Sequence, residues 1–522
     1  MRIRTAIARC VVPPCVLAPP ARRRSVALGL AFVALAVCAR ATAADLATLS
    51  PVLRGAYAAV AERHVDPPDL ARFTAAGLRG LVSIDRDLAL ERERERLVLR
   101  GPSGVLARAE ASALASLPGA WEAAFRLIEA AVAASAPLRA QGNETLLRLF
   151  LNDALADLDP YSRYVPRSEA RAARMRRFGE AGLGLELAPE GGAAVVRRVI
   201  DDSPAWAAGL RPGDRVLAID GRTTRGLDAE ALQGLLRGEE NEPLTLTVAR
   251  RGGRSETVVL VRAMVAAETV FVLWHGTIPV LRVSGFNRLT DRRLARAVVE
   301  VAHRDPAPPG LVLDLRGNRG GLLRQAIAAA DLFLSDGVIA EARGRHPDAS
   351  RVHRASGPDL AAGLPIVVLV DGSSASSAEV LAAALQDNGR AALVGSVTTG
   401  KGLIQTVVPL ADDSEVHLTW ASLHAPSGYP IQGLGVLPDV CTSRGETAME
   451  RDLRRRAAGQ GPEAGGAWRA VRERPAAVGE IARLRDVCPP SAGGELDIAA
   501  ALWLLRGAAL DQDRSLAKRG SP

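Results

Sequence analysis

The sequence has almost no lysine. Of its 66 lysine and arginine residues, only Lys401 and Lys518 are lysines, so nearly every positive charge is carried by arginine. Arginine keeps its proton in proteins, whereas a buried lysine can lose it because burial lowers a lysine pKa by about 3 to 5 units. Lys401, set between glycines in "GSVTTGKGLIQ", therefore indicates a position that requires a basic group able to release its proton.

Cysteine, histidine and several hydrolase motifs are also scarce. The five cysteines form no CxxC pair and no cluster with histidine, which gives no basis for a zinc site. The seven histidines form no HExxH motif, and the serines form no GxSxG motif. These absences exclude the HExxH zinc-peptidase motif and the GxSxG pattern of many serine hydrolases.

Residues 1–44 differ from the rest of the chain. They contain seven arginines and no acid, and "ARRRS" leads into 13 apolar residues, Val26 to Cys38, followed by small residues in "ARATAAD". A basic segment, a short apolar segment and an A-x-A-like site are typical of a secretory signal peptide. The apolar segment is shorter than the roughly 20 residues that span a bilayer, so we favour a cleaved leader over a membrane anchor.

Export changes what the net charge and the cysteines mean. The chain carries +8, and the leader supplies +7 of it, which leaves +1 for the remaining residues. That balance gives no reason to expect nucleic-acid binding. Cys441 and Cys488 are the two cysteines beyond the leader, and in an oxidising compartment they form either one disulfide or two free thiols.

The pattern after the leader changes three times. Residues 45–175 have apolar residues at helical spacing and predict a helical region, with "ERERERLVLR" interpreted as a solvated helix face. Residues 176–265 alternate short strands with glycine turns, which predicts a small, partly open β-barrel. Residues 266–445 mix unbroken β-branched runs with helices, as in an α/β layered fold. Residues 446–522 are Arg-rich and helical.

The loop around Lys401 has two chemical interpretations. "GSVTTGK" fits the G-x-x-x-x-G-K phosphate loop, but Gly402 stands where a magnesium-binding Ser or Thr is required, and "LIQTVVPL" after it predicts a strand instead of a helix. Nucleotide binding is therefore disfavoured. In the second interpretation, a neutral Lys401 takes a proton from a serine hydroxyl.

Candidate nucleophiles stand about 25 residues upstream, in "VDGSSASSAEVL". The serines at 373, 374, 376 and 377 follow a predicted buried strand and precede a helix. Serines at such turns are most often N-caps, which is the structural alternative. The N-terminus of the helix also presents free N–H groups and a positive dipole end, which suit an oxyanion.

Together these segments resemble the C-terminal processing peptidases, also called tail-specific proteases, which are exported serine peptidases with a Ser–Lys dyad and an embedded PDZ domain. The resemblance runs from "LDPYSRYV" to "GLGVLPDV", residues 158–440. "GLGLEL" and "DSPAWAAGLRPGDRVLAIDG" look like a PDZ domain, and "LVLDLRGNRGG" looks like the loop on the oxyanion side. "SSASSAEVLAAALQDNGRAALVGSVTTGKGLIQ" is similar to the catalytic segment.

The resemblance implies a fold and a set of site residues. The fold is a multidomain α/β chain with a signal peptide (1–44), a helical N-terminal region, a PDZ domain (176–265), an α/β peptidase core (266–445) and a helical C-terminal region. The implied residues are, for catalysis, Ser376, Lys401 and Gln405; for the oxyanion hole, Ser377 with Gly320 or Gly321; and for peptide binding, Leu183, Gly184 and Leu185.

The expected partners follow from these roles. Substrates would be proteins or peptides with apolar, unfolded C-termini, with an adaptor or regulator as a further candidate partner. Membrane association is expected only if the leader stays uncleaved, and the mechanism needs neither metal nor other cofactor. A catalytically inactive PDZ scaffold of the cell envelope is the main alternative, and the presence of the dyad with Gln405 argues against it.

Overall fold

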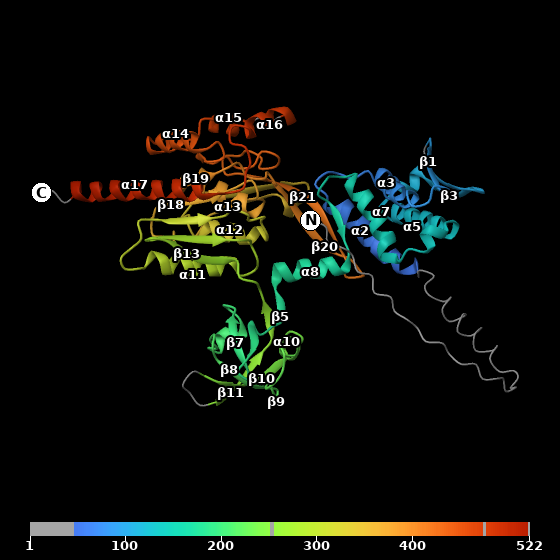
Figure 1. The fold of residues 1–522 in the computed structure, drawn as a ribbon. Coiled ribbons are helices and arrows are strands. Elements are labelled where there is room, and N and C mark those ends of the chain that lie inside the picture. The colour runs from blue at the N-terminus through green and yellow to red at the C-terminus, as the bar shows by residue number, and fades with distance from the viewer. Residues whose placement is uncertain (1–45, 95, 251–254, 473–476, 520–522) are drawn as a thin grey trace, which may run out of the picture.

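A computed structural model describes residues 46–94, 96–250, 255–472 and 477–519. The predicted leader lies outside these residues. Figure 1 shows a helical N-terminal region beside an α/β core, with a small β-domain below them on a narrow neck. Among the described helices, none is both long and apolar enough to cross a membrane.

The N-terminal region is a bundle of helices around one apolar core. Its helices are α2 (Leu49–Arg63), α3 (Leu70–Val82), α4 (Ala111–Leu114), α5 (Leu117–Ala134), α6 (Ala136–Arg139) and α7 (Asn143–Ala156), preceded by the short η1 (Leu46–Thr48). Tyr57, Phe73 and Phe150 are fully buried at its centre. The predicted helical region is confirmed for most of its length.

The charge run in this region is a β-hairpin, so its interpretation as a helix face was wrong. Strands β1 (Ala89–Glu93), β2 (Arg96–Gly101) and β3 (Gly104–Glu110) form an antiparallel sheet. Arg100 pairs across the hairpin with Glu91 at 2.6 Å and with Glu93 at 2.5 Å. Charges that alternate every second residue share one face of a strand, and this period-two pattern outweighed the helix propensity of Glu and Arg.

The small β-domain has the short strands predicted for residues 176–265, together with two helices. Its elements are β6 (Leu185–Glu190), β7 (Ala193–Val199), α9 (Pro204–Ala207), β8 (Arg215–Ile219), β9 (Arg222–Thr223), α10 (Ala229–Leu236), β10 (Pro243–Ala249) and β11 (Ser255–Val261). The sheet order is β11-β10-β8-β7-β6, with β9 paired to β8. Strand β6 is therefore an edge strand, and α10 packs beside it.

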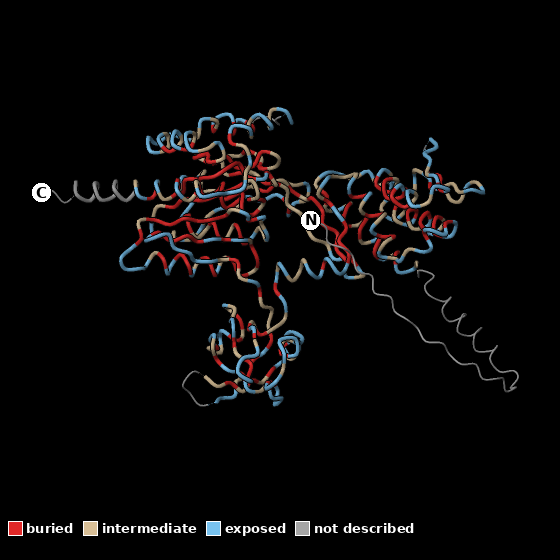
Figure 2. Tube along the Cα trace, in the orientation of Figure 1, coloured by how far each residue is buried: buried red, intermediate tan, exposed pale blue. Residues whose placement is uncertain are grey.

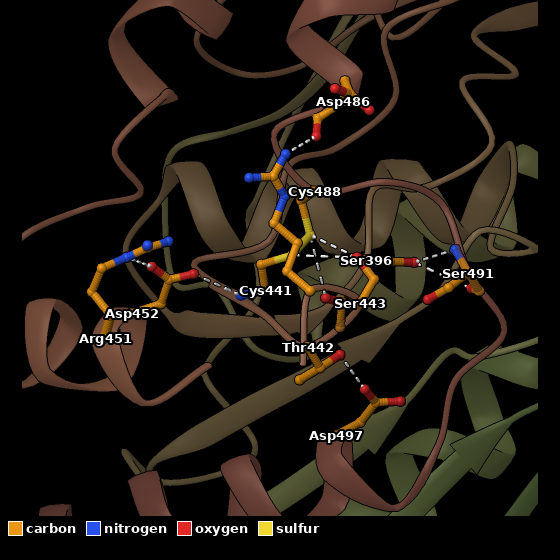
Figure 3. The surroundings of a disulfide bond; sticks show 12 residues. Ser396, Cys441, Thr442, Ser443, Arg451, Asp452, Asp486, Cys488, Ser491 and Asp497 are labelled. Atoms are coloured by element: carbon orange, nitrogen blue, oxygen red, sulfur yellow. Dashed lines mark hydrogen bonds and ion pairs between the residues drawn. A yellow bond between two sulfur atoms is a disulfide. The ribbon is translucent and has the colours of Figure 1, made fainter. Parts of the chain in front are cut away.

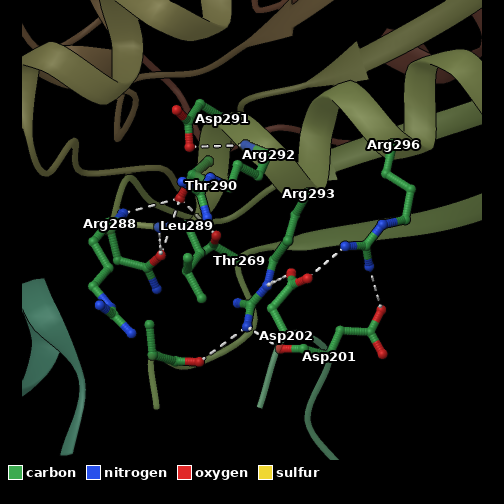
Figure 4. Close-up of polar contacts among 12 residues, drawn as sticks. Asp201, Asp202, Thr269, Arg288, Leu289, Thr290, Asp291, Arg292, Arg293 and Arg296 are labelled. Carbon is green, nitrogen blue, oxygen red and sulfur yellow. Dashed lines mark hydrogen bonds and ion pairs between the residues drawn. The ribbon is translucent and has the colours of Figure 1, made fainter. Parts of the chain in front are cut away.

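A two-stranded neck and a group of ion pairs join this domain to the core. Strands β5 (Glu180–Gly182) and β12 (Ala263–Val265) pair antiparallel. Arg293, on core helix α11 (Thr290–Ala302), donates to the carbonyl oxygens of Asp201 at 3.0 Å and Ala266 at 3.1 Å. Arg296 pairs with the carboxylates of Asp201 and Asp202 (Figure 4). These contacts hold one side of the β-domain against the core.

The core is a mostly parallel sheet with helices on both faces. Its order is β13 (Val270–His275), β14 (Ile278–Val283), β15 (Leu311–Asp314), β18 (Ile366–Val370), β19 (Ala391–Gly395) and β22 (Val440–Cys441), with only β13 antiparallel to its neighbour. Helices α11, α12 (Leu323–Asp331) and α13 (Ser377–Asp387) pack on one face, and α14 (Glu446–Ala457) and α17 (Glu495–Arg519) on the other. The central strands are buried on both sides (Figure 2), as their β-branched runs predicted.

A long hairpin links the core to the N-terminal region. A second sheet has the order β17 (Arg351–Arg354), β16 (Val338–Gly344), β21 (Glu415–His424) and β20 (Leu403–Pro409), with β4 (Arg163–Val165) also paired to β21. Leu423 packs in the core cluster, whereas Val416 and Leu418 pack in the N-terminal cluster. Helix α8 (Arg167–Phe178) then leads from β4 to the neck.

The C-terminal segment is fastened to the core by a disulfide. Cys441 at the end of β22 is bonded to Cys488, which follows α15 (Gly465–Ala470) and α16 (Val478–Arg485) (Figure 3). The carbonyl of Cys488 accepts from the N–H of Val397 at 3.3 Å, and the carbonyl of Ser491 accepts from the N–H of Gly372 at 2.8 Å. The segment thus contacts the loops that follow β18 and β19.

Candidate active site

The serine-rich loop joins β18 to α13, and its serines differ in burial and in hydrogen bonding. Ser374 is fully buried, and its hydroxyl donates to the carbonyl of Leu315 at 2.8 Å while accepting from the N–H of Asp371 at 3.0 Å. Those bonds give Ser374 a structural role. Ser377 is 1 % exposed, and its hydroxyl donates to the carbonyl of Gly321 at 3.1 Å.

Ser376 differs from both of these neighbours. It is partly exposed, lies directly before the first turn of α13, and has φ 56° and ψ −117°. A serine side chain in this conformation is strained, and such strain persists only where surrounding contacts hold the backbone in place. The strained turn positions the side chain of Ser376 at the wall of a cavity.

Most of the predicted catalytic residues line this one cavity of about 310 Å³. Ser376, Ser377, Lys401, Gln405 and Gly321 contribute to its wall. The remaining lining residues are apolar or basic: Leu322, Leu323, Leu403, Ile404, Val407, Leu423, Arg177, Arg319 and His417. The fold therefore brings together residues that span 84 positions of the sequence, from Gly321 to Gln405.

The carboxylate of Glu379 links the loop that carries Ser376 to the loop that carries Lys401. Its carboxylate is fully buried, and Oε2 accepts from the N–H of Ser376 at 2.7 Å and from the N–H of Lys401 at 2.9 Å. Oε1 accepts from the N–H of Gly400 at 2.6 Å and from the hydroxyl of Thr398 at 2.5 Å. Burial raises the pKa of Glu379, and the four donated hydrogen bonds oppose that effect.

Sequence reasoning assigned no role to Glu379. The spacing Ser-x-x-Glu at the start of a helix predicts a capping box, in which the glutamate accepts from the N–H of the serine. This pattern predicts only one of the four hydrogen bonds that the Glu379 carboxylate accepts. The other three come from a loop about twenty residues further along the chain, and the sequence pattern carries no information on that contact.

Lys401 lies in the loop that follows β19, two residues before β20 begins. Burial lowers its pKa below the ordinary value of 10.5, the positive charge of Arg163 lowers it further, and Glu379 acts in the opposite direction. The lysine side chain therefore gives up its proton more readily than an exposed lysine. The strand that follows also removes the phosphate-loop interpretation, which requires a helix at this point.

The glycine after Lys401 has a steric cause. A Cβ at Gly402 would lie 2.2 Å from the backbone nitrogen of Gln432, which no side chain tolerates. The N–H of Gly402 donates to Oε1 of that same glutamine at 2.9 Å. The residue that a phosphate loop would use for magnesium is therefore fixed as glycine by close backbone packing.

Gln405 is held by the "LDPYSRYV" segment. Its amide nitrogen donates to the carbonyl of Tyr161, and the Tyr161 hydroxyl accepts from the amide nitrogen of Gln432 at 2.8 Å. The same segment thereby supports both the start of β20 and the loop that packs against Gly402. This arrangement leaves the side-chain oxygen of Gln405 for another donor in the cavity, because the amide nitrogen is already used.

The two glycines considered for an oxyanion hole are not equivalent. The N–H of Gly320 donates to Oδ1 of Asn318 at 2.8 Å, whereas the N–H groups of Gly321 and Ser377 meet no acceptor among the described residues. A Cβ at Gly320 would lie 2.9 Å from Cβ of Ser376, so only glycine allows this loop to approach the serine. Gly321 and Ser377 are thus the two free donors beside Ser376.

The predicted peptide-binding residues line a separate groove in the small β-domain. Leu183, Gly184 and Leu185 border a cavity of about 550 Å³ between β6 and α10. The carbonyl oxygens of Leu183 and Gly184 accept from the N–H groups of Ala205 and Ile200, which turns them into the domain. Edge strand β6 therefore presents an unpaired side next to this loop.

Comparisons with known proteins identify related domains in the same places. Residues 277–442 match peptidase family S41, and residues 195–250 match a PDZ domain. Over 302 residues the chain is 37% identical to the carboxy-terminal-processing protease of Bartonella bacilliformis, an alignment that covers 57% of this chain and 70% of that protein. It is 31% identical over 284 residues to a probable CtpA-like serine protease of Staphylococcus saprophyticus, covering 54% and 57%.

Among solved structures, the photosystem II D1 C-terminal processing protease is similar at 27% identity and a TM-score of 0.35, covering 70% of this chain and 92% of that one. The PDZ domain of a carboxy-terminal protease from Vibrio cholerae, solved in complex with a peptide, aligns at 21% identity and a TM-score of 0.16. That alignment covers 17% of this chain and 98% of the other.

Proposed function

Because this chain belongs to the carboxy-terminal-processing proteases of peptidase family S41, we propose that it is an exported serine endopeptidase that uses a Ser376–Lys401 dyad. The observation that carries the proposal is the cavity that both side chains line, with Glu379 bonded to the backbone N–H of each. A serine on a strained turn beside a partly buried lysine is an arrangement that suits acyl transfer.

In the proposed mechanism, Oγ of Ser376 attacks the peptide carbonyl while neutral Lys401 accepts the hydroxyl proton. The resulting ammonium then donates that proton to the leaving amine. Water attacks the acyl-enzyme with Lys401 again acting as base, which restores the serine. The lowered pKa of Lys401 supports this role because a general base works best when its pKa lies near the working pH.

The oxyanion of the tetrahedral intermediate would be bound by the N–H groups of Ser377 and Gly321. The first N–H groups of α13 have no partner within the helix, and the helix dipole adds positive potential there. One such donor is worth about 2.7 to 4 kcal/mol in the transition state. Gly320 would act differently, since its N–H is already bonded to Asn318 and its role is to allow the close approach.

Gln405 would orient the amine of Lys401. Its amide nitrogen is fixed on the Tyr161 carbonyl, so its oxygen is the atom that would accept a hydrogen bond from Nζ. An amide oxygen does not change charge with pH, and it would therefore hold the amine without acting as a second base.

Substrate tails would bind in the groove of the PDZ domain. A peptide C-terminus would add as a strand beside edge strand β6, with its carboxylate bound by N–H groups of Leu183, Gly184 and Leu185. Ile200, Leu236 and Val265 also line the groove, and their apolar side chains would favour an apolar last residue. The cavity between β6 and α10 is large enough for a short extended segment.

Export is supported by the N-terminal composition and by the disulfide. Cysteine pairs such as Cys441–Cys488 form and persist in oxidising compartments, which agrees with a periplasmic or cell-envelope protein. N-terminal sequencing of the exported protein should then begin at Asp45. A chain that still begins with the leader would contradict cleavage and favour a membrane-anchored form.

The experiment that tests the proposed function compares wild type with Ser376→Ala on an unfolded protein that ends in an apolar tail. We expect wild type to degrade it and Ser376→Ala to bind the tail with unchanged affinity without cleaving it. Equal binding with no cleavage by either protein would instead support the inactive PDZ scaffold.

A further inference from the structure

The wall of the candidate active site carries basic residues and no acid. Arg177, Arg319 and His417 line the cavity beside Lys401, and every other lining side chain is apolar or small apart from the serines and Gln405. None of the residues that line it is Asp or Glu. A substrate side chain in this cavity therefore meets a surface of one sign of charge.

The basic residues differ in how far their charge is already balanced. Glu415, which lies behind the wall, pairs with Arg177 at 3.1 Å, with Arg174 at 2.7 Å and with Nε2 of His417 at 2.9 Å. Burial also lowers the pKa of His417, which favours its neutral form. Glu415 thus offsets the charge of Arg177, and the imidazole of His417 adds little positive charge to the wall.

Arg319 is the cation of the wall that remains unbalanced. It is exposed, and its guanidinium forms no ion pair or hydrogen bond with the part of the chain that the structure describes. It immediately precedes Gly320, whose Cα lies close enough to Ser376 that an added Cβ would meet the serine Cβ at 2.9 Å. The free guanidinium is therefore attached to the loop that borders the reacting carbonyl.

We propose that Arg319 selects substrates with a carboxylate at a residue next to the scissile bond. The inference rests on the proposed peptidase function and adds a substrate class to it. The guanidinium presents paired N–H donors that match the two oxygens of a carboxylate. The carboxylate could belong to an acidic side chain or to the C-terminus of a tail cut very close to its end.

The test uses peptides that differ only by Glu or Gln at the residue before or after the scissile bond, each made with a free and with an amidated C-terminus. At low salt, wild type should cleave the better-placed Glu peptide with a kcat/KM about fivefold above its Gln partner, and added salt should reduce that ratio. Arg319→Gln should bring the ratio to about one. Arg324→Gln, which neutralises an exposed arginine outside the cavity, should keep it.

The free and amidated peptides also show whether the carboxylate belongs to a side chain or to the C-terminus. They further distinguish a failure of this inference from a failure of the proposed peptidase function. A preference that depends on the free C-terminus alone would assign Arg319 to the tail carboxylate. Equal cleavage of Glu and Gln peptides by wild type, or a ratio unchanged in Arg319→Gln, would overturn the inference. If wild type cleaves Glu and Gln peptides equally and Ser376→Ala cleaves neither, the proposed peptidase function stands without the charge preference. If wild type cleaves no peptide, both the peptidase function and the role of Arg319 are contradicted.

Discussion

Replacing Glu379 by glutamine should damage catalysis more than substrate binding. Glutamine has the same shape but offers one acceptor oxygen and one donor nitrogen. If its oxygen takes the place of Oε2, the N–H groups of Ser376 and Lys401 keep an acceptor, while the amide nitrogen faces the N–H of Gly400. The N–H of Gly400 then loses its acceptor, the Thr398 hydroxyl has to turn and accept from the amide nitrogen, and two charge-assisted hydrogen bonds become neutral ones.

The size of the effect follows from those contacts. A buried N–H without an acceptor costs about 1 to 3 kcal/mol, and each change from a charged to a neutral acceptor costs about 1 kcal/mol more. The free energy of unfolding should therefore fall by about 3 to 5 kcal/mol. Relaxation of the strained Ser376 and of the Lys401 loop should lower kcat by about 100-fold, because small displacements of reacting groups carry that penalty.

Urea unfolding and steady-state kinetics measure the two effects separately. Kinetics should be run at a temperature where circular dichroism shows Glu379→Gln to be folded, with Glu300→Gln as control because Glu300 is exposed on α11. We expect KM and tail-peptide affinity near those of wild type, with only kcat reduced. A folded Glu379→Gln whose kcat stays within threefold of wild type would refute the positioning role.

Three further outcomes follow from the structure. Arg163→Gln removes a positive charge that lowers the pKa of Lys401, so the acidic limb of the kcat/KM profile should move to higher pH by up to about 0.7 unit; a shift to lower pH would contradict the assignment of the base. Cys488→Ser opens a link between residues 47 apart and should reduce the free energy of unfolding by about 3 to 4 kcal/mol in denaturant titrations, with a loss under 1 kcal/mol arguing against a stabilising disulfide. Amidating the C-terminus of a tail peptide should raise its KM about tenfold if the PDZ loop binds the carboxylate, and an unchanged KM would remove that contact from the account.

Short sequence patterns were sufficient to predict much of the secondary structure. The β-branched runs of β15 and β18 predicted strands buried on both faces, and the short strands expected in residues 176–265 are present. Helix α13 follows the serine-rich turn as predicted, and Gly389 at φ 67° stands one residue beyond its C-cap, where glycine is favoured. In each case the signal lies within a few residues, so no knowledge of tertiary contacts was needed.

The parts that sequence could not supply depend on long-range contacts. The charge run at residues 91–96 alternates in sign with a period of two, and it favours a strand only once the neighbouring strands pair with it. The pairing of Cys441 with Cys488 needs the C-terminal segment to fold back over the core. The same holds for Glu379, whose bonds to the lysine loop exist only once β18, β19 and β20 have brought the two loops together.

The central claim is that Lys401 acts by releasing its proton, and Lys401→Arg tests it most directly. Arginine keeps the positive charge and the length of the side chain but does not deprotonate in a protein. Cleavage of an unfolded, apolar-tailed protein, followed by mass spectrometry of the fragments, should fall to the level of Ser376→Ala in this variant, while tail binding persists. Cleavage by Lys401→Arg at the wild-type rate would contradict the account.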